Sequence, residues 1–460
     1  MSMMTNCRQI LKDEFFERVE FFNQFLCAQD IFDAAAAANY QWRDRIWTPL
    51  QTLWAFLVQV LEVGCSCREA VSHVLAEQAA LGQQVTASPD PSGYCQGRQR
   101  LPLSLLKSAV RCVGQRLSGK VSSAYLWCNR RIWVVDGSSC SMPDTPELRK
   151  TFGQPDNIEA GCGFPVAKLV TMFSWATGAV QDVAIGVYRS SELVLWKQLW
   201  GQLQTGDIVL GDRLYCVYSY LAQLLQIGCD GVFRLHGGRS RTIDFRHGMR
   251  LGKNDRLQRW TRPVQCPKGI SQACWQSLPM TLTVRVIRFS TQVPGFRSKT
   301  IMVATTLLDP KEYSLEQIAG LYRDRWTAEL RLRDVKSTLG MDVLRCKSSQ
   351  MVQKEIYMHF LVYNLIRVLM WQACQTHHRP MHRLSFAGTV QRFEAICPYL
   401  LLFSGTKRLT VLYQLLLTWI AHDVLPYRPN RTEPRALKRR PKEYAWLNKP
   451  RHLMKERRTK

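Results

Sequence analysis

Hydrophobic and polar positions follow two different patterns along the chain, and the change falls near residue 125. Before it, Trp47–Leu61 is a long apolar segment, and Leu103–Leu117 repeats its apolar positions at helical spacing. Between them, Ala87–Gly93 is rich in Ser, Asp, Pro and Gly, which predicts a loop. We therefore expect residues 1–125 to form a helical N-terminal domain.

Short strand-like runs alternate with helical ones after residue 125. The segments predicted as strands are Arg131–Val135, Val166–Trp175, Val180–Tyr188, Asp207–Leu210 and Gly231–Leu235, and those predicted as helices are Ser191–Leu203 and Tyr215–Ile227. Strands that alternate with helices imply an α/β core. This pattern predicts the first part of that core over residues 126–233.

The alternation breaks at Arg234. Residues 234–262 contain nine Arg and Lys against two acids, and strand-like runs follow at Leu282–Phe289 and Thr300–Thr305. We expect residues 234–300 to be a basic, β-rich insertion that interrupts the α/β core.

The second part of the core is predicted over residues 301–372, where Ser314 and Gln317 have the spacing of a capping box at the start of a helix. Residues 373–460 are expected to be a helical C-terminal region that ends in a basic tail. The last 33 residues, 428–460, hold 13 Lys and Arg, three acids and four prolines, which indicates a weakly folded segment.

The 460 residues carry 62 Lys and Arg against 36 Asp and Glu, a formal net charge of +26, which indicates a polyanionic partner. A membrane surface is the rival to nucleic acid. The N-terminus mixes charges into its apolar residues and does not resemble a signal peptide, and the most apolar stretch, Ile356–Trp371, is interrupted by His359, Asn364 and Arg367. We expect an intracellular protein that binds nucleic acid and no membrane.

Two acids, Asp136 and Asp212, each follow a short apolar run and precede a predicted turn or loop. In α/β sheets, sites form at the carboxyl ends of strands, where two carboxylates could share divalent cations. An acid after a strand is more often turn chemistry or a helix cap, so each residue alone is weak evidence.

Tyr322, Arg325, Glu329 and Lys336 stand at offsets 0, 3, 7 and 14 in a predicted helix. At about 100° per residue they fall within an arc of roughly 60°, and Arg333 lies close to the same face. A solvated helix face with ion pairs such as Glu329–Arg333 would give the same pattern.

The spacing of these four residues resembles the Tyr-Arg-Glu-Lys (YREK) signature of bacterial insertion-sequence transposases with a DDE active site. The resemblance runs from about Ile132 to Ser348, and residues 1–125 are similar in pattern only. Other segments that look like motifs of this family are Asp136-Gly137-Ser138, Gly211-Asp212-Arg213 and Lys336-Ser-Thr-Leu-Gly340.

The resemblance implies an RNase H-like fold in which Asp136, Asp212 and Glu329 hold two Mg²⁺ ions, with Mn²⁺ as a substitute. Three acids suit Mg²⁺, which is a hard cation and prefers carboxylate oxygens to Cys or His. Two ions can activate the attacking oxygen and stabilise the leaving oxygen of a phosphodiester. The DNA-binding candidates are Tyr322, Arg325, Lys336, Arg333 and Arg213.

Trp260, in the basic insertion, is a further DNA-binding candidate because it could stack on an extruded base at the cleaved end. Trp275 is a rival for this role, and either tryptophan could belong to the core.

By this resemblance the protein would bind the terminal inverted repeats of its own insertion sequence, cleave there and join the 3′-hydroxyl ends to target DNA. It would act as a homodimer in a synaptic complex, in the bacterial cytoplasm at the nucleoid. The alternatives are a metal-dependent nuclease without strand transfer and a DNA-binding protein without catalysis.

Overall fold

The computed structural model describes most of the chain. The described residues are 20–43, 45–82, 85, 87–155, 162–267, 269–290, 300–403, 406–426, 447, 449–450 and 453. The predicted basic tail lies outside them except for residues 447, 449–450 and 453.

Helices make up the described N-terminal part, as the sequence predicts. They are α2 (Glu20–Asn23), α3 (Ala28–Ala37), α4 (Pro49–Leu61), α5 (Cys67–Ala80), α6 (Ser92–Arg100), α7 (Leu103–Gly119) and a 3₁₀ turn, η2 (Ser123–Tyr125). The hydroxyl of Thr48 accepts from the backbone N–H of Gln51 at 3.2 Å and caps α4. The predicted loop up to Gly93 is too long, because α6 already begins at Ser92.

The described strands form one nine-stranded sheet in the order β3-β2-β1-β4-β5-β9-β8-β7-β6. The strands are β1 (Ile132–Ser141), β2 (Val166–Ser174), β3 (Val180–Gly186), β4 (Ile208–Gly211), β5 (Asp230–Arg234), β6 (Met249–Gly252), β7 (Asp255–Thr261), β8 (Thr281–Ser290) and β9 (Thr300–Thr305). β4 pairs in parallel with β1 and β5, and the other pairs are antiparallel. The predicted α/β class is confirmed.

The segment predicted as an insertion extends the core sheet, because β8 pairs with β9 and β9 pairs with β5. It also contains short helices α11 (Gly237–Thr242) and α12 (Gln272–Ser277). Arg285 of β8 is fully buried and forms a two-point ion pair with Asp255 of β7 at 2.6 and 2.9 Å. This arginine therefore serves the packing of the insertion.

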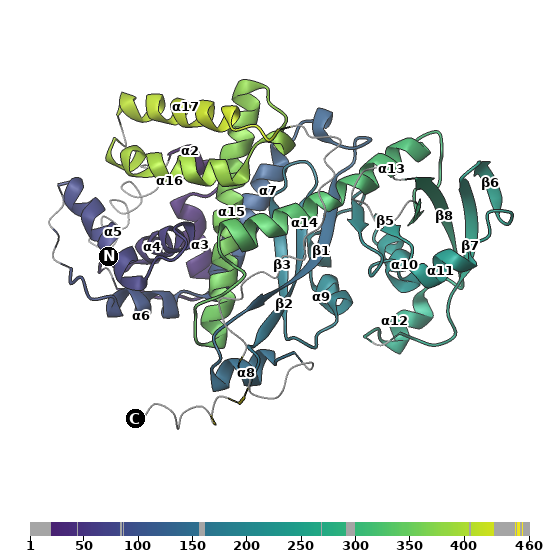
Figure 1. Cartoon of the computed structure of the whole chain (residues 1–460), viewed down its shortest axis with the longest axis horizontal. Coiled ribbons are helices and arrows are strands. Elements are labelled where there is room, and N and C mark those ends of the chain that lie inside the picture. Colours follow the sequence, from purple (N-terminus) through teal and green to yellow (C-terminus); the bar gives the residue numbers. More distant parts are fainter. Residues whose placement is uncertain are drawn as a thin grey trace.

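Two apolar cores lie on the two faces of the sheet, and alternate residues of β1 contribute to each. Val134 belongs to the core shared with α7 and α15 (Ser349–His377), whereas Val135 belongs to the core shared with α9 (Glu192–Gln198) and α10 (Tyr218–Gln226). Figure 1 shows α15 in the middle of the molecule, between the N-terminal helices and the sheet, and it contacts α4, α7 and β3.

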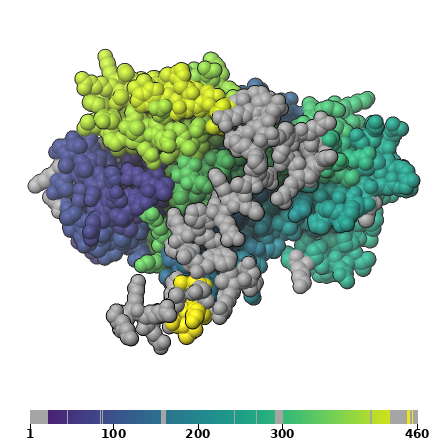
Figure 2. Space-filling view, in the orientation of Figure 1, coloured from purple at the N-terminus to yellow at the C-terminus, as the bar shows by residue number. Residues whose placement is uncertain are grey.

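The remaining helices complete the chain. They are α8 (Pro146–Phe152), the 3₁₀ turns η3 (Trp200–Gln202) and η5 (Met381–Arg383), α13 (Leu315–Asp324), α14 (Trp326–Arg333), the π-helical turn η4 (Asp334–Thr338), α16 (Phe386–Leu402) and α17 (Lys407–His422). Figure 2 shows the N-terminal helices and the insertion at opposite ends of the molecule. None of the helices in the described part of the chain is long and apolar enough to cross a membrane.

Candidate active site

Asp136 and Asp212 meet at the carboxyl end of β4. The sequence places Asp136 at the end of its strand, and this is wrong, because β1 continues to Ser141 through its pairing with β2. The parallel pairing of β1 with β4 stops at Val134, opposite Leu210. Asp136 therefore lies on β1 beyond the last residue paired with β4, and Asp212 directly follows β4.

Asp212 also stabilises the turn that follows β4. Its Oδ1 accepts from the backbone N–H of Leu214 at 2.7 Å. This contact is the turn chemistry that the sequence allowed as an alternative, and it leaves Oδ2 available for another partner.

The helix that carries Glu329 is interrupted at Arg325. Helix α13 ends at Asp324 and α14 begins at Trp326, with Arg325 at the junction. The capping box of Ser314 and Gln317 is confirmed, with hydrogen bonds of 3.1 and 2.8 Å. The predicted single helix is thus two short helices followed by a π-helical turn.

Arg325 lies between two of the predicted catalytic acids. Its Nη2 donates to Glu329 Oε1 at 2.7 Å, and its Nη1 lies 4.0 Å from Asp136 Oδ2. The Arg325 side chain is 8% exposed and that of Glu329 is 52% exposed, so the arginine is the buried partner. Glu329 pairs with Arg325 rather than with Arg333, the partner considered from the sequence.

The three acids act on one another electrostatically. Burial raises the pKa of Asp136 to about 6, Arg325 opposes this rise, and the negative charges of Glu329 and Asp212 add to it. The structure therefore brings the charges of Glu329 and Asp212 close enough to act on Asp136, and the catalytic role of the three acids stays a prediction.

The other predicted DNA-binding residues have different surroundings. Tyr322 is buried, with its ring edge-on to Phe289. Lys336 Nζ forms an ion pair with Asp342 Oδ1 at 2.8 Å. Arg213 and Arg333 are exposed.

Trp260 is 8% exposed and belongs to the core that the sheet shares with α9 and α10. The guanidinium of Arg239 stacks over its ring at 4.1 Å. Trp275 belongs to the same core. Base stacking by Trp260 stays a prediction, and it would require Arg239 to move from the ring.

Sequence reasoning missed Glu192 and Tyr215. Glu192 stands in the first turn of α9, and its carboxylate lies against Gly137, the residue after Asp136. Burial raises the pKa of Tyr215 well above its usual value, and the charges of Glu192, Asp136 and Asp212 add to the rise. No linear motif marks Glu192, because its proximity to β1 depends on the packing of α9.

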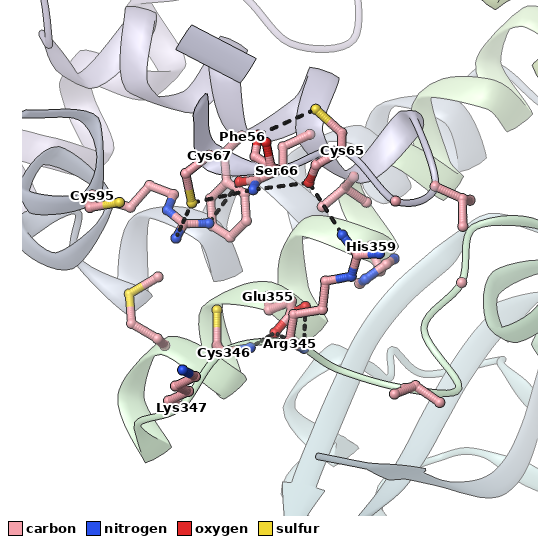
Figure 3. A pocket seen from close by; sticks show the side chains of 18 of the residues that line it. Phe56, Cys65, Ser66, Cys67, Cys95, Arg345, Cys346, Lys347, Glu355 and His359 are labelled. Carbon is pink, nitrogen blue, oxygen red and sulfur yellow. Dashed lines mark hydrogen bonds between the residues drawn. The ribbon is translucent and has the colours of Figure 1, made fainter. Parts of the chain in front are cut away.

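A cavity of about 660 Å³ lies between the N-terminal helices and the segment that precedes α15; we call it the junction cavity (Figure 3). Its lining includes the cations Arg98, Arg345 and Lys347. Arg345 donates to the Cys65 carbonyl at 3.3 Å, and Arg98 donates to Gln59 Oε1 at 2.7 Å.

The cations that line the junction cavity are not neutralised by ion pairs with carboxylates of the described residues. Its acid, Glu355, accepts from the backbone N–H groups of Arg345 and Cys346 at 2.9 to 3.1 Å. Within the described residues, no carboxylate forms an ion pair with Arg98, Arg345 or Lys347. These cations are therefore suited to an external anion.

Comparisons with known proteins show the family to which the chain belongs. Residues 127–365, just over half of the chain, match the family model of the transposase DDE domain. Transposase InsG for insertion sequence element IS4, from Escherichia coli strain K12, is 26% identical over 370 residues, which cover 77% of this chain and 78% of InsG. Putative transposase InsZ of the same strain is 27% identical over 143 residues, 30% of this chain and 47% of InsZ.

Among solved structures, the piggyBac transposase synaptic complex with hairpin DNA matches at a TM-score of 0.47 and 10% identity, covering 90% of this chain and 87% of that one. The match to the family model over more than half of the chain shows that the protein is an enzyme of the DNA-cleaving and strand-transferring class and belongs to the DDE transposase family. Within that family it is similar to the IS4 transposase.

Transposase DDE domains use divalent metal ions, and the chemistry of the donor set fits such an ion, since Asp136, Asp212 and Glu329 offer carboxylate oxygens. Among the described residues, no three His, Cys, Asp or Glu side chains are close enough together to hold one ion. The Arg325 guanidinium is the cation that lies between Asp136 and Glu329.

Proposed function

We propose that this chain is the transposase of an insertion sequence and belongs to the YREK subgroup. It binds the terminal inverted repeats of its element, cleaves the phosphodiester bonds there and joins the 3′-hydroxyl ends to target DNA in a cut-and-paste reaction. The observation that carries this proposal is the meeting of Asp136 and Asp212 at the end of β4, with Glu329 linked to Asp136 through Arg325.

The proposed core is RNase H-like. Its strands β1 to β5 have the order β3-β2-β1-β4-β5, with β4 parallel to both of its neighbours. This core comprises residues 126–233 and 301–372 and is interrupted by the insertion 234–300. Residues 1–125 bind the DNA ends, and residues 373–460 provide a helical region and a basic tail.

Asp136, Asp212 and Glu329 would hold two Mg²⁺ ions, for which Mn²⁺ substitutes. Bound ions would activate the attacking oxygen and stabilise the negative charge on the leaving oxygen. Arg325 would exchange its carboxylate partners for a phosphate, to which a guanidinium can donate two hydrogen bonds. Lys336 would exchange Asp342 for a phosphate in the same way and act as a point charge.

Double-stranded DNA, as terminal repeats and as target, is the proposed partner, and a homodimer would bring two ends together. The net charge of +26 supports attraction to the phosphate backbone. Tyr322, Arg213, Arg333 and Trp260 remain proposed DNA contacts. The proposed place of action is the bacterial cytoplasm at the nucleoid.

The test incubates the full-length protein and Mg²⁺ with labelled duplexes that carry the element's terminal repeats. We expect Asp136→Asn, Asp212→Asn and Glu329→Gln to bind DNA but to cleave it about 1,000-fold more slowly or worse. Glu316→Gln is the matched control, because Glu316 is an exposed acid in the first turn of α13.

Three outcomes would contradict parts of this proposal. Normal cleavage by any of the three variants would remove that residue from the site. Cleavage by the wild type without joined products would favour a nuclease, and binding without cleavage would favour a DNA-binding protein.

A further inference from the structure

We propose that Glu192 is a fourth carboxylate of the catalytic site and helps to hold a divalent cation, directly or through a bound water molecule. This inference rests on the proposed function, and it adds a residue that the Asp-Asp-Glu pattern does not contain.

Gly137 shows how close Glu192 comes to the catalytic strand. A Cβ atom at position 137 would lie 2.7 Å from Glu192 Cδ and closer still to Oε2. Gly137 has no positive φ, so its backbone conformation does not require glycine. The space that the missing side chain leaves is filled by the Glu192 carboxylate, and the N–H of Gly137 donates to Asp136 Oδ1 at 3.0 Å.

The packing of α9 fixes the direction of Glu192. Leu195 and Trp196, three and four residues later on the same helix face, are buried against the sheet. Trp196 packs edge-on against Tyr215, with ring centroids 6.4 Å apart. Glu192 therefore lies one helical turn from buried residues and faces β1.

The open edge of β1 allows carboxylates from both sheet faces to reach one place. Side chains of Asp136 and Gly137 alternate between the faces, so Glu329 approaches from the α14 side and Glu192 from the α9 side. Because β4 ends at Gly211, none of the described strands pairs with Asp136 and Gly137 on that edge, which is next bridged at Ser141 by Val343.

The Tyr215 hydroxyl is buried without a partner, and the Glu192 carboxylate has only the charge of Lys168 to oppose the rise of its pKa on burial. Glu192 is half-buried and has no hydrogen bond or ion pair with a described residue. Tyr215 is 1% exposed, and its hydroxyl has no hydrogen-bond partner among the described residues. The nearby Lys168 donates instead to the Ser190 carbonyl at 3.1 Å.

A hydrated divalent cation would satisfy both groups at once. Its charge would balance the Glu192 carboxylate, and a bound water could accept a hydrogen bond from the Tyr215 hydroxyl. The alternative is that Glu192 only stabilises the N-terminus of α9 through the helix dipole.

The experiment titrates full-length protein with Mn²⁺ alone and follows free Mn²⁺ by electron paramagnetic resonance. We expect Glu192→Gln to raise the dissociation constant about 10- to 100-fold, while Glu316→Gln, which also removes a first-turn acid, changes it less than about twofold. Without metal, the melting temperature of Glu192→Gln should equal or exceed that of the wild type, because burial and the charge of Asp212 disfavour the Glu192 carboxylate and only Lys168 opposes them.

Gly137→Ala provides a second test that removes no charge. Its Cβ should displace the Glu192 carboxylate and weaken Mn²⁺ binding, with no further loss when combined with Glu192→Gln. If Glu192→Gln does not fold, Mn²⁺ binding by Gly137→Ala alone tests whether Glu192 helps to hold the cation.

Asp136→Asn, measured alongside, separates this inference from the proposed function. If Asp136→Asn loses Mn²⁺ binding while Glu192→Gln and Gly137→Ala bind normally, the role of Glu192 is wrong and the proposed site survives. If Asp136→Asn and the wild type bind Mn²⁺ equally, or neither binds, both proposals are wrong. A lower melting temperature of Glu192→Gln with unchanged affinity would assign Glu192 to helix stability alone.

Discussion

The candidate active site and the junction cavity both contain arginines, but the charges of these arginines have different partners. In the active site, Arg325 donates to Glu329 at 2.7 Å and lies 4.0 Å from Asp136. In the junction cavity, Arg98 and Arg345 donate to neutral groups. The first arrangement balances charge within the protein, whereas the second leaves positive charge for an external anion.

This difference separates two contributions to DNA binding. Phosphates that entered the junction cavity would find cations without a carboxylate partner, and such contacts would provide affinity without sequence choice. Arg325 would have to break its ion pair with Glu329 before it could bind a DNA phosphate. Binding of DNA by Arg325 would therefore free the Glu329 carboxylate. We infer that the cavity contributes to initial binding and that Arg325 contributes to assembly of the active site.

The largest effect is expected from Arg325→Ala. Cleavage should fall by about 100-fold or more, because a phosphate contact at the reacting centre is lost. At pH 8 and without DNA, Mn²⁺ affinity should rise about tenfold, since no guanidinium then competes for the carboxylates. Cleavage assays and Mn²⁺ titration measure the two effects.

Arg323→Ala is the control for this change, because Arg323 is an exposed arginine two residues away. It should leave both quantities near the wild-type values. If Arg325→Ala loses cleavage but binds Mn²⁺ as the wild type does, Arg325 serves DNA alone, and the contrast between the two regions is weaker than we infer.

A smaller effect is expected from Arg345→Ala in the junction cavity. Binding to a labelled duplex should weaken several-fold, and the slope of log affinity against log salt should become shallower by about one. Fluorescence anisotropy at several salt concentrations measures both. Lys347→Ala should lower the affinity and the salt slope by similar amounts.

Arg379→Ala provides the control for the cavity, because Arg379 is exposed just beyond the other end of α15, a helix of 29 residues. An unchanged salt slope in Arg345→Ala, or an equal change in Arg379→Ala, would show that the cavity has no special part in binding DNA.

Local patterns predicted the elements of the core well, because strands such as Val166–Ser174 and helices such as Leu103–Gly119 have apolar residues at the spacing of their own secondary structure. The end of β1 could not be predicted in this way. Residues Asp136 to Ser141 are polar or small, and their extended form depends on pairing with β2, a contact between distant parts of the chain.

Contacts within the candidate site could likewise be predicted only in part from local spacing. The family resemblance predicted Asp136, Asp212 and Glu329 as the site, but the helical spacing of Arg325, Glu329 and Arg333 allowed either arginine as the partner of Glu329. The break between α13 and α14 and the burial of Arg325 favour Arg325. Glu192 could not be found from spacing, since its position depends on the packing of Trp196.

The last prediction concerns stability rather than DNA or metal binding, at Asp334 in the π-helical turn that follows the helix of Glu329. Burial raises its pKa to about 6 from an ordinary value of 3.8, although Arg367, Arg333 and Arg331 oppose this rise. Here, nearby arginines do not keep a buried carboxylate charged at mildly acidic pH. Replacing Asp334 tests whether burial or the nearby arginines decide the charge of this carboxylate.

A raised folded-state pKa makes the protonated form the stabilising one. Its contribution is fully present below about pH 4 and is lost as the pH rises through about 6. Asp334→Asn should therefore match the wild type in stability at pH 4 and exceed it at pH 7, by at most about 3 kcal/mol. Thermal melting of both proteins across this range measures the difference, with Glu316→Gln as the control for loss of one exposed acid. A difference that does not depend on pH would show that the three arginines offset the effect of burial on the charge of Asp334.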